Sequence, residues 1–398
     1  MTKLQDRTVA FVGTGTTRFA RFIEDQTRDE LLAEAVTKAI ADAGLQRSDI
    51  DGFISTISGN AYQTAAMLGL YGANVCFTNE NGCGSSGYAC DIARWAVQSG
   101  RCKNVVLVCG GKESATGRTV LGSNLGGRAF SQTVHPNLHW QALDPVWGGI
   151  WLHQYACQAR RHMYEFGTTA EQIAAVSVGN RYNASLNPEA VYRKLITVED
   201  VVNSKMISSP LTMLMCASVN DGASACVMTT AERAQDLPHD PVYVLGTGSA
   251  FTGYSLTKMP DESGEFSMTR TVGKLAANRA FARAGVDRSD IDLCNWCEHF
   301  APTVIINLED YGFCEKGEGG AFVSDGKTKI GGALPVCTYG GEMSGTHAGG
   351  AHSALIETIR QLQHVRGVGQ VKDAEVGLFA STCGKTSTHS IQILGRSR

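Results

Sequence analysis

Strand-like and helix-like segments alternate along this chain. Residues 8–12, 52–57 and 105–109 have the composition of short strands, and residues 105–109 are apolar throughout, as in a strand buried on both faces. Residues 28–43 and 88–99 instead carry apolar positions at helical spacing. This alternation predicts an α/β protein whose mostly parallel sheets are covered by helices on both faces.

The chain contains an internal repeat. Residues 38–52 read KAIADAGLQRSDIDG and residues 279–293 read RAFARAGVDRSDIDL, an offset of 241 residues (279 − 38). A second echo pairs residues 105–114 (VVLVCGGKES) with residues 377–387 (GLFASTCGKTS). The repeats predict two copies of one α/β unit with a long insert between them.

We therefore expect three parts in the chain. Residues 1–114 together with 204–235 form a first half, residues 236–398 form a second half, and residues 115–203 form the insert. A long inserted segment usually covers a functional site. We expect the insert to cover the site of this protein and to shape a tunnel that leads to it.

A cysteine lies in a turn of small residues before a predicted helix. Residues 82–87 read Gly-Cys-Gly-Ser-Ser-Gly, with Cys83 as the second residue. Glycines let the backbone bend sharply and approach a substrate closely. The free N–H groups at the helix start stabilise a thiolate and can bind an oxyanion. Cys83 is thus a candidate nucleophile, and the alternative is a small buried cysteine in a strand-to-helix turn.

Composition and charge narrow the classes of function. The 398 residues carry a formal net charge of −3 and no long basic run, so we expect no nucleic acid and no membrane as partner. No apolar run approaches the ~20 residues of a membrane span, and residues 1–6 lack a signal-peptide pattern. The 13 scattered cysteines indicate free thiols and a cytoplasmic location. The single CxxC, at residues 294–297, has no second pair, so no metal is expected.

Four groups of residues in the middle of the chain are similar to one known superfamily. They are Met163-Tyr164 with Phe166-Gly167-Thr168, Glu171-Gln172-Ile173-Ala174 with Asn180-Arg181, Thr197-Val198-Glu199-Asp200-Val201-Val202, and Asn220-Asp221-Gly222-Ala223. With the duplication and the cysteine turn after the third strand, the chain resembles the thiolase superfamily over nearly its whole length. More narrowly, it resembles the sterol-carrier-protein-X-type and lipid-transfer-like thiolase branch. The resemblance implies a duplicated thiolase fold of five layers, αβαβα, with two mixed sheets.

The resemblance also implies binding partners. Thiolases dimerise through their sheet edges, so a homodimer is expected. Residues 311–319 and 334–341 are similar to members that pair with a small zinc-ribbon/OB-fold protein. The chain as a whole is compatible with the large subunit of benzoylsuccinyl-CoA thiolase. Acyl-CoA and coenzyme A are expected as substrates, with no permanently bound cofactor.

The first of the four catalytic loops of thiolases usually reads Cys-x-Ser-Gly. Its counterpart here, residues 83–87, is one residue longer. Aligned on the cysteine, the family's nucleophile is Cys83. Aligned on Ser86 and Gly87, it falls on Gly84, and some lipid-transfer-like relatives without thiolase activity also have glycine there.

The other three loops have counterparts in the second half. Asn-Glu-Ala-Phe or His-Asp-Cys-Phe becomes Cys-Glu-His-Phe, with Cys297 in place of an oxyanion-hole residue and His299 as the candidate to substitute for it. Gly-His-Pro appears as Thr-His-Ala and keeps its histidine as His347. Cys-x-Gly appears shortened, as Cys383-Gly384.

The reaction that this resemblance implies is the thiolytic cleavage of a β-oxoacyl-CoA into two acyl-CoAs. Cys83 attacks the β-carbonyl, His347 takes its proton and holds the thioester oxygen, and Cys383 protonates the released enolate. Further candidates are, for catalysis, Glu298 and His299 and, for contact with coenzyme A, Gly84, Ser85 and Gly384.

Two other functions stay open at this point. One is a retro-aldolase on a β-hydroxyacyl-CoA, as in the steroid side-chain lyases of this branch, whose sites are led by tyrosines without a nucleophilic cysteine. Cys297 stands where such a tyrosine often precedes the acidic residue, and Tyr339 is another tyrosine in the second half. The other is a non-catalytic acyl-CoA-binding subunit of a complex.

Overall fold

The computed structural model describes residues 8–56, 60–79, 84–112, 114, 151–252, 266–383 and 387–397, with the backbone alone at Trp151 and Cys383. Within these residues, main-chain hydrogen bonds form a nine-stranded mixed sheet and a two-stranded sheet. The strand order in the large sheet is β3-β2-β4-β7-β1-β8-β11-β10-β9. The small sheet pairs β5 (Met206–Ser208) with β6 (Leu211–Thr212).

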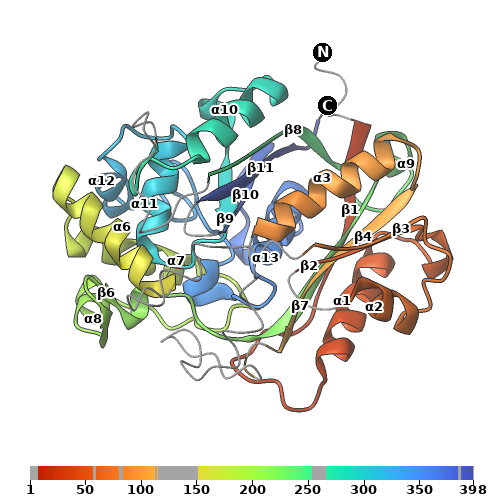
Figure 1. The fold of residues 1–398 in the computed structure, drawn as a ribbon, viewed down its shortest axis with the longest axis horizontal. Coiled ribbons are helices and arrows are strands. Elements are labelled where there is room, and N and C mark those ends of the chain that lie inside the picture. The colour runs from red at the N-terminus through yellow and green to blue at the C-terminus, as the bar shows by residue number, and fades with distance from the viewer. Residues whose placement is uncertain are drawn as a thin grey trace.

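The large sheet has two halves, which meet at β1 and β8 (Figure 1), and the order β2-β4-β7-β1 of the first half recurs as β9-β10-β11-β8 in the second. The strands are β1 (Val9–Thr16), β2 (Gly52–Thr56), β3 (Val75–Asn79), β4 (Asn104–Lys112) and β7 (Asp221–Thr230) in the first half, and β8 (Val242–Phe251), β9 (Leu293–Trp296), β10 (Val376–Cys383) and β11 (Thr388–Gly395) in the second. In both halves the outer strands are parallel, and the strands next to the junction are antiparallel. Only Ala10–Tyr243 and Phe11–Val242 pair across the junction. The two expected sheets are thus joined edge to edge by a short seam.

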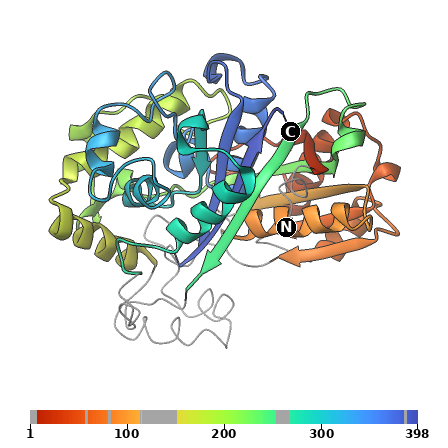
Figure 2. The same ribbon diagram turned by 90° about the horizontal axis from the view of Figure 1, so that it is seen from above.

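Helices cover both faces of each half and form the expected five layers. The middle helices α3 (Ser85–Gln98) and α13 (Ala351–Leu362) contact each other and strands of both halves. Outside the first half lie α1 (Arg28–Asp42) and α2 (Ala61–Met67), and α10 (Gly273–Ala284) packs on β8 and β11 of the second. Figure 2 shows the long strands of the second half beside the middle helix α3.

Two aspartates that occupy equivalent positions in the sequence repeat, Asp51 and Asp292, have the same structural role at the start of β4 and of β10. The Asp51 carboxylate accepts hydrogen bonds of 2.9 Å from the backbone N–H groups of Lys103 and Asn104, where β4 begins. Asp292 does the same for the backbone at the start of β10, at 2.8 and 2.9 Å. Each aspartate therefore fixes the position of the strand that follows the middle helix of its own half.

Paired glycines let the outer helices approach the junction strands. A Cβ atom at Gly13 or Gly15 of β1 would lie 2.5 or 2.2 Å from backbone oxygens of α1. Gly246 and Gly248 of β8 face α10 in the same way, with backbone atoms 2.3 and 2.1 Å from the Cβ position. Because real Cβ atoms do not come this close, both halves need glycine here.

The long helices of the insert, α6 (Trp151–Phe166) and α7 (Ala170–Ser185), pack against the second half. The short helix α8 (Val198–Val202) packs on α7. Helix α7 contacts α11 (Ala301–Asp310) and α12 (Gly319–Ser324), and α6 contacts α11. Figure 1 shows this group on the side of the molecule opposite α1 and α2.

The remaining described elements are short: η2 (Arg47–Asp49), η6 (Met213–Met215), α9 (Ala231–Ala234), η7 (Arg288–Asp290), η8 (Gly341–Gly345) and η9 (Gly367–Gly369). Of the helices in the described ranges, none has both the length and the apolar character needed to cross a membrane. The division of the chain into 1–114 with 204–235, 115–203 and 236–398 stays a prediction.

A histidine is buried in the middle layer. His352 lies in the first turn of α13 with no exposed surface, and its Nε2 is 3.8 Å from the Cys226 sulfur on β7. Because burial disfavours the imidazolium, it lowers the pKa of His352 to about 4. The folded protein thus keeps this side chain neutral at pH values where the unfolded chain protonates it.

We predict that His352 makes the fold sensitive to acid. Because its pKa is lowered on folding from 6.5 to about 4, its contribution to stability is complete above pH 6.5 and is lost as the pH falls toward 4. The loss is on the order of 3 kcal/mol. Urea unfolding at pH 7 and pH 4 should show a larger loss for the wild type than for His352→Gln. His364→Gln, at a partly buried histidine after α13, is the control that should keep the wild-type loss. Equal losses in the wild type and His352→Gln would contradict the prediction.

Candidate active site

Segments from both halves meet at the end of β10. Ser381 Oγ donates a hydrogen bond of 3.1 Å to the carbonyl of Gly84 and accepts one of 3.0 Å from the N–H of Gly87. The Thr382 N–H donates to the sulfur of Cys297, 3.1 Å away, in the loop after β9. The start of α3, the Cys-Glu-His-Phe loop and the end of β10 therefore lie side by side.

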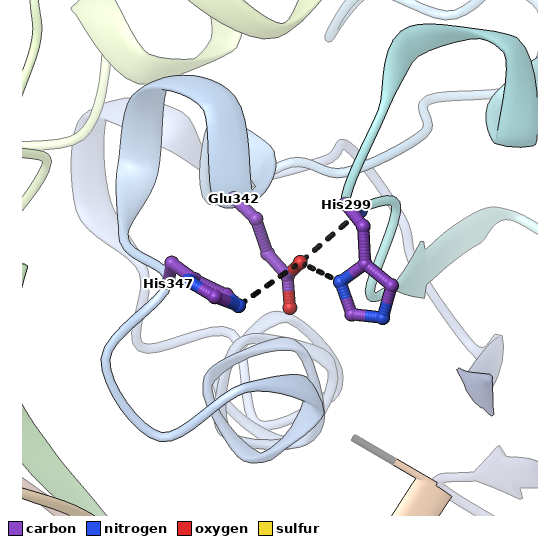
Figure 3. Close-up of side chains that lie close together, drawn as sticks. All are labelled: His299, Glu342 and His347. Carbon is purple, nitrogen blue, oxygen red and sulfur yellow. Dashed lines mark hydrogen bonds and ion pairs between the residues drawn. The ribbon is translucent and has the colours of Figure 1, made fainter. Parts of the chain in front are cut away.

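A buried carboxylate stands between two imidazoles at this place (Figure 3). Glu342 lies in the π-helical turn η8, and its Oε2 accepts hydrogen bonds from Nδ1 of His299 at 2.5 Å and from the His299 N–H at 3.1 Å. The same oxygen is 3.8 Å from Nε2 of His347. The side chain of Glu342 is fully buried, whereas those of His299 and His347 are 12% and 19% exposed. The imidazoles, and not the carboxylate, are therefore the groups that a ligand can reach.

The imidazoles set the charge of Glu342. Burial by itself raises a carboxyl pKa, but the positive charges of His299 and His347 and the hydrogen bonds from His299 outweigh burial, so that the pKa of Glu342 is lowered. An ionised carboxylate on Nδ1 of His299 assigns the proton of the neutral ring to that nitrogen and leaves the lone pair on Nε2. Such a histidine–carboxylate pair is suited to general-base catalysis.

Glu298 has a different role from Glu342. It is fully buried, and its Oε1 accepts hydrogen bonds from Asn180 at 2.9 Å and from the backbone N–H groups of Glu342 and Met343 at 2.5 and 3.2 Å. Burial, followed by the charge of Glu342, raises the pKa of Glu298 to about 8. Its acceptor capacity is used to organise the turn that carries Glu342, so its contacts are those of a positioning residue.

Two backbone conformations at the site are unusual. His299 has φ = +29°, a value that residues with a side chain rarely adopt and that is typical of functional sites. Gly341 has φ = +63°, and a Cβ atom there would lie 2.0 Å from Oε1 of Glu298. Only glycine at this position lets η8 wrap around the Glu298 carboxyl.

Asn220 fixes the position of the His347 loop. Its Oδ1 accepts hydrogen bonds from the backbone N–H groups of His347 at 2.6 Å and Ala348 at 3.2 Å. Its Nδ2 donates to Ser218 Oγ at 2.7 Å. Because Asn220 is fully buried just before β7, it ties a loop of the second half to the first half of the chain.

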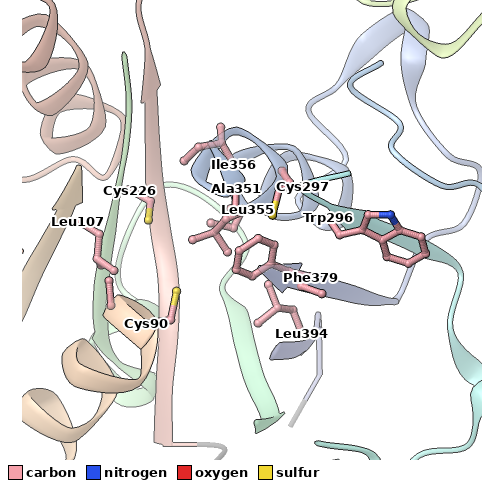
Figure 4. Close-up of a cluster of buried hydrophobic side chains, with 14 of the residues drawn as sticks. Cys90, Leu107, Cys226, Trp296, Cys297, Ala351, Leu355, Ile356, Phe379 and Leu394 are labelled. Carbon is pink, nitrogen blue, oxygen red and sulfur yellow. The ribbon is translucent and has the colours of Figure 1, made fainter. Parts of the chain in front are cut away.

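Cys297 belongs to the hydrophobic core. Figure 4 shows it among buried side chains that include Leu355 of α13 and Phe379 of β10. Burial raises the pKa of its thiol. Cys297, which was expected to replace an oxyanion-hole residue, thus presents a buried sulfur, and His299, two residues away, is partly exposed.

The described residues include part of the predicted site. Cys83 and Gly384 lie outside them, and so does the side chain of Cys383. Gly84 and Ser85 stand at the start of α3, where the Ser85 side chain is buried. The roles assigned to these five residues, and those assigned to His347, Glu298 and His299, stay predictions.

Glu342 and Asn220 could not be recognised as site residues from the sequence alone. Glu342 is the acidic residue of a glycine-rich run, residues 340–345, just before His347. The signal that could have identified it is a single acidic residue between glycines, five residues before the candidate base His347. Asn220 was noted only within a segment similar to thiolases. Its contact with His347 could not be predicted, because the two residues are 127 positions apart in the chain.

We predict that Asn220→Ala destabilises the protein by about 2 kcal/mol, because the N–H of His347 loses its acceptor and that of Ala348 keeps only Thr346 Oγ1. Ser218→Ala is the matched control, since it removes the hydroxyl that Asn220 contacts and leaves the His347 loop untouched. That change should cost under about 1 kcal/mol. Urea unfolding followed by circular dichroism measures both values. The role given to Asn220 would be wrong if its replacement cost no more than that of Ser218.

Both halves of the chain match family models. Residues 9–232 match the model described as "Thiolase, N-terminal domain", and residues 248–396 match "Thiolase C-terminal domain-like". These two stretches include β1 to β7 and all but the first residues of the second half of the large sheet. The predicted α/β fold of thiolase type is thus confirmed.

Relatives with two kinds of name are almost equally similar. The acetyl-CoA acetyltransferase of Methanothermobacter thermautotrophicus is 34% identical, with 98% of this chain and 100% of the relative covered. The steroid side-chain-cleaving aldolase of Thermomonospora curvata is 33% identical, with 98% of each chain covered. Among solved structures, the Ltp2–ChsH2(DUF35) aldolase superposes with a TM-score of 0.87 at 29% identity and 99% coverage of both chains.

The narrower branch is also represented among the relatives. The benzoylsuccinyl-CoA thiolase subunit BbsB of Thauera aromatica is 28% identical, with 90% of each chain covered. Sterol carrier protein 2 of Bos taurus is 27% identical over 93% of this chain and 69% of the relative. From its fold, its site and these similarities, this chain belongs to the thiolase family.

Proposed function

We propose that the protein cleaves a β-oxoacyl-CoA with coenzyme A into two acyl-CoAs, through an acyl group bound to Cys83. The observation that carries the proposal is the pair of partly exposed imidazoles, His299 and His347, on the buried carboxylate of Glu342. The start of α3, next in sequence to Cys83, is hydrogen-bonded to β10 two residues before Cys383. This arrangement supports a site in which residues of both halves act on one thioester.

The first half-reaction forms the acyl-enzyme. His347 takes the thiol proton of Cys83, and the thiolate attacks the β-carbonyl carbon. The Cα–Cβ bond then breaks, its electron pair passes to the departing acyl-CoA as an enolate, and Cys383 gives that enolate its proton. The products of this step are the free acyl-CoA and a thioester on Cys83.

The second half-reaction returns the enzyme to its starting state. Coenzyme A gives its thiol proton to the Cys383 thiolate and attacks the thioester carbonyl, and Cys83 leaves and regains the proton held by His347. Glu342 stabilises the imidazolium of His347 while it holds that proton. Both N–H groups of the neutral His299 donate to Glu342, so the N–H groups in the first turn of α3 are the donors that we propose for the oxyanions.

For the acyl group we propose an aromatic substrate such as benzoylsuccinyl-CoA. The support is the 28% identity over 90% of the chain to a protein named as a benzoylsuccinyl-CoA thiolase subunit. Incubation of the purified protein with benzoylsuccinyl-CoA and with short-chain β-oxoacyl-CoA compares the two classes directly.

We predict that Cys83→Ala lowers thiolysis by at least about 1,000-fold, because the acyl group then has no covalent acceptor. Cys157→Ala, at an exposed cysteine of α6, is the control and should keep wild-type activity. Chromatography of the acyl-CoA products measures the rate. Full activity of Cys83→Ala would remove this residue from the mechanism, and an inactive wild type would favour a non-catalytic acyl-CoA-binding subunit.

A second candidate reaction is a retro-aldol cleavage of a β-hydroxyacyl-CoA. The 33% identity to a steroid side-chain-cleaving aldolase favours it. Tyr339 is not positioned as the catalytic tyrosine of this reaction, because it is buried and its hydroxyl donates a hydrogen bond of 3.2 Å to the Trp296 carbonyl. The base would be His299 with Glu342, and the cleavage would need neither coenzyme A nor Cys83. Cleavage of a β-hydroxyacyl-CoA by the Cys83→Ala variant in the absence of coenzyme A would identify this reaction.

We also propose a homodimer through the free edge of the first half. Strand β3 ends the large sheet and pairs with β2 alone among the described strands. Phe77 on β3 is 45% exposed, and the neighbouring Tyr62 and Tyr71 are 67% and 82% exposed. An apolar edge strand is favourable for pairing with a second chain and unfavourable in water.

A charge on this edge should therefore break the dimer. We predict that Phe77→Lys shifts the protein from dimer to monomer, as measured by size exclusion with light scattering. Val368→Lys replaces another exposed apolar residue, far along the chain on η9, and should stay dimeric. A monomeric wild type, or a dimeric Phe77→Lys variant, would count against the β3 interface.

A small zinc-ribbon/OB-fold subunit is the second partner that we propose. The support is the similarity of residues 311–319 and 334–341 to members with such a partner. The similar Ltp2–ChsH2(DUF35) aldolase and a relative named as a thiolase subunit also support a partner of this kind. Co-purification of this chain with a co-expressed partner of that type is the corresponding measurement.

A further inference from the structure

We propose that His299, Glu342 and His347 form a binding site for one divalent transition-metal ion of the zinc type. The three side chains come from the loop after β9, from η8 and from the loop before α13 (Figure 3). Sequence spacing gave no sign of such a site, because 43 residues separate His299 from Glu342. The ion would bind where the base chemistry is proposed, so its effect on activity rests on the proposed function.

The geometry of the donor atoms fits such an ion. One atom from each residue can be chosen so that all three lie within 4.8 Å of one another. Ligand distances of ~2.0–2.1 Å in a tetrahedral zinc site place donor atoms about 3.4 Å apart. The present distances to Glu342 Oε2, 2.5 Å from His299 and 3.8 Å from His347, lie on either side of that value. Small side-chain rotations, with the Nδ1 proton of His299 moving to its Nε2, are therefore enough to take up an ion.

The chemistry of the donors selects the class of metal. Two imidazole nitrogens and one carboxylate suit zinc and its first-row neighbours, whereas calcium and magnesium prefer oxygen ligands alone. Oε1 of Glu342 is buried and has no hydrogen-bond partner among the described residues, so a second carboxylate oxygen is available to a cation. The ionised carboxylate also offsets part of the ion's charge.

The surroundings already hold the ligands in place. Glu298 fixes the backbone of Glu342, and Asn220 fixes the backbone of His347. The two imidazoles are partly exposed while the carboxylate is buried beneath them. The exposed side leaves a fourth coordination position for water or for a thioester oxygen, as in open zinc sites.

Metal binding would compete with the base. A bound ion occupies the imidazole lone pair that takes the proton of the nucleophile, so zinc should act as a reversible inhibitor of thiolysis. A chelator should restore the rate. The protein would then be sensitive to the level of free transition metal through the residues that carry its chemistry.

The test measures binding apart from activity. The full chain, freed of metal with a chelator, is titrated with Co²⁺ and, separately, with Zn²⁺ at neutral pH, and metal content is determined after gel filtration. Cobalt absorption distinguishes imidazole and carboxylate ligands from thiolates, which give a charge-transfer band. The variants are His299→Gln, Glu342→Gln and His347→Gln. His239→Gln is the matched control, because His239 also contacts a carboxylate, Asp42 at 3.0 Å, but without a second histidine in the contact.

We expect one ion per chain, a spectrum without the thiolate band, and at least a tenfold loss of affinity in each site variant but not in His239→Gln. Circular dichroism checks the fold of each variant, and the two histidine variants suffice if Glu342→Gln does not fold. Absence of stoichiometric binding to the wild type, a thiolate band, or wild-type affinity in the folded site variants would overturn the proposal. A protein that binds the ion but performs no thiolysis would keep the site and reject the proposed function, and an active enzyme that binds no ion would do the reverse.

Discussion

A single buried negative charge, on Glu342, organises the candidate active site of this molecule. An isolated carboxylate in the protein interior is strongly unfavourable, so its ionised state depends on the donors around it. His299 contacts it through both ring and backbone, and His347 faces it from the other side. Loss of either imidazole would leave the charge only partly compensated, and loss of the charge would leave two histidines without a common anchor. The two partly exposed rings thus face the same carboxylate oxygen, with their planes at 73° to each other.

Two neighbouring glutamates illustrate how environment divides roles between identical side chains. Glu298 and Glu342 are both fully buried, yet the pKa of Glu298 is raised and that of Glu342 is lowered. The difference comes from their partners, since Glu298 contacts amide donors and the negatively charged Glu342, while Glu342 contacts two imidazoles. One carboxyl therefore holds a backbone turn, and the other supplies a charge.

Local features of the sequence predicted most of the fold. The helices at residues 28–43 and 88–99 were recognised from apolar spacing, and the two halves from the Arg-Ser-Asp-Ile-Asp repeat. The contact that joins the halves at β1 and β8 could not be predicted, because it involves only two residue pairs between strands far apart in the chain. The candidate site was predictable to the same extent. His299 and His347 lie in loops that could be recognised from local sequence, whereas Glu342 is recognisable as a site residue only from its contact with His299, 43 positions away in the chain.

The position of the insert has a consequence for how this architecture arose. In sequence, α6 and α7 follow β4 of the first half, but in space they pack on α11 and α12 of the second, and Asn180 of α7 contacts Glu298. An ancestral single unit that acquired this segment would have exposed its packing face to water unless a second copy stood beside it. The insertion therefore depended on the duplication, and a first half that carries the insert would not be stable as an autonomous domain.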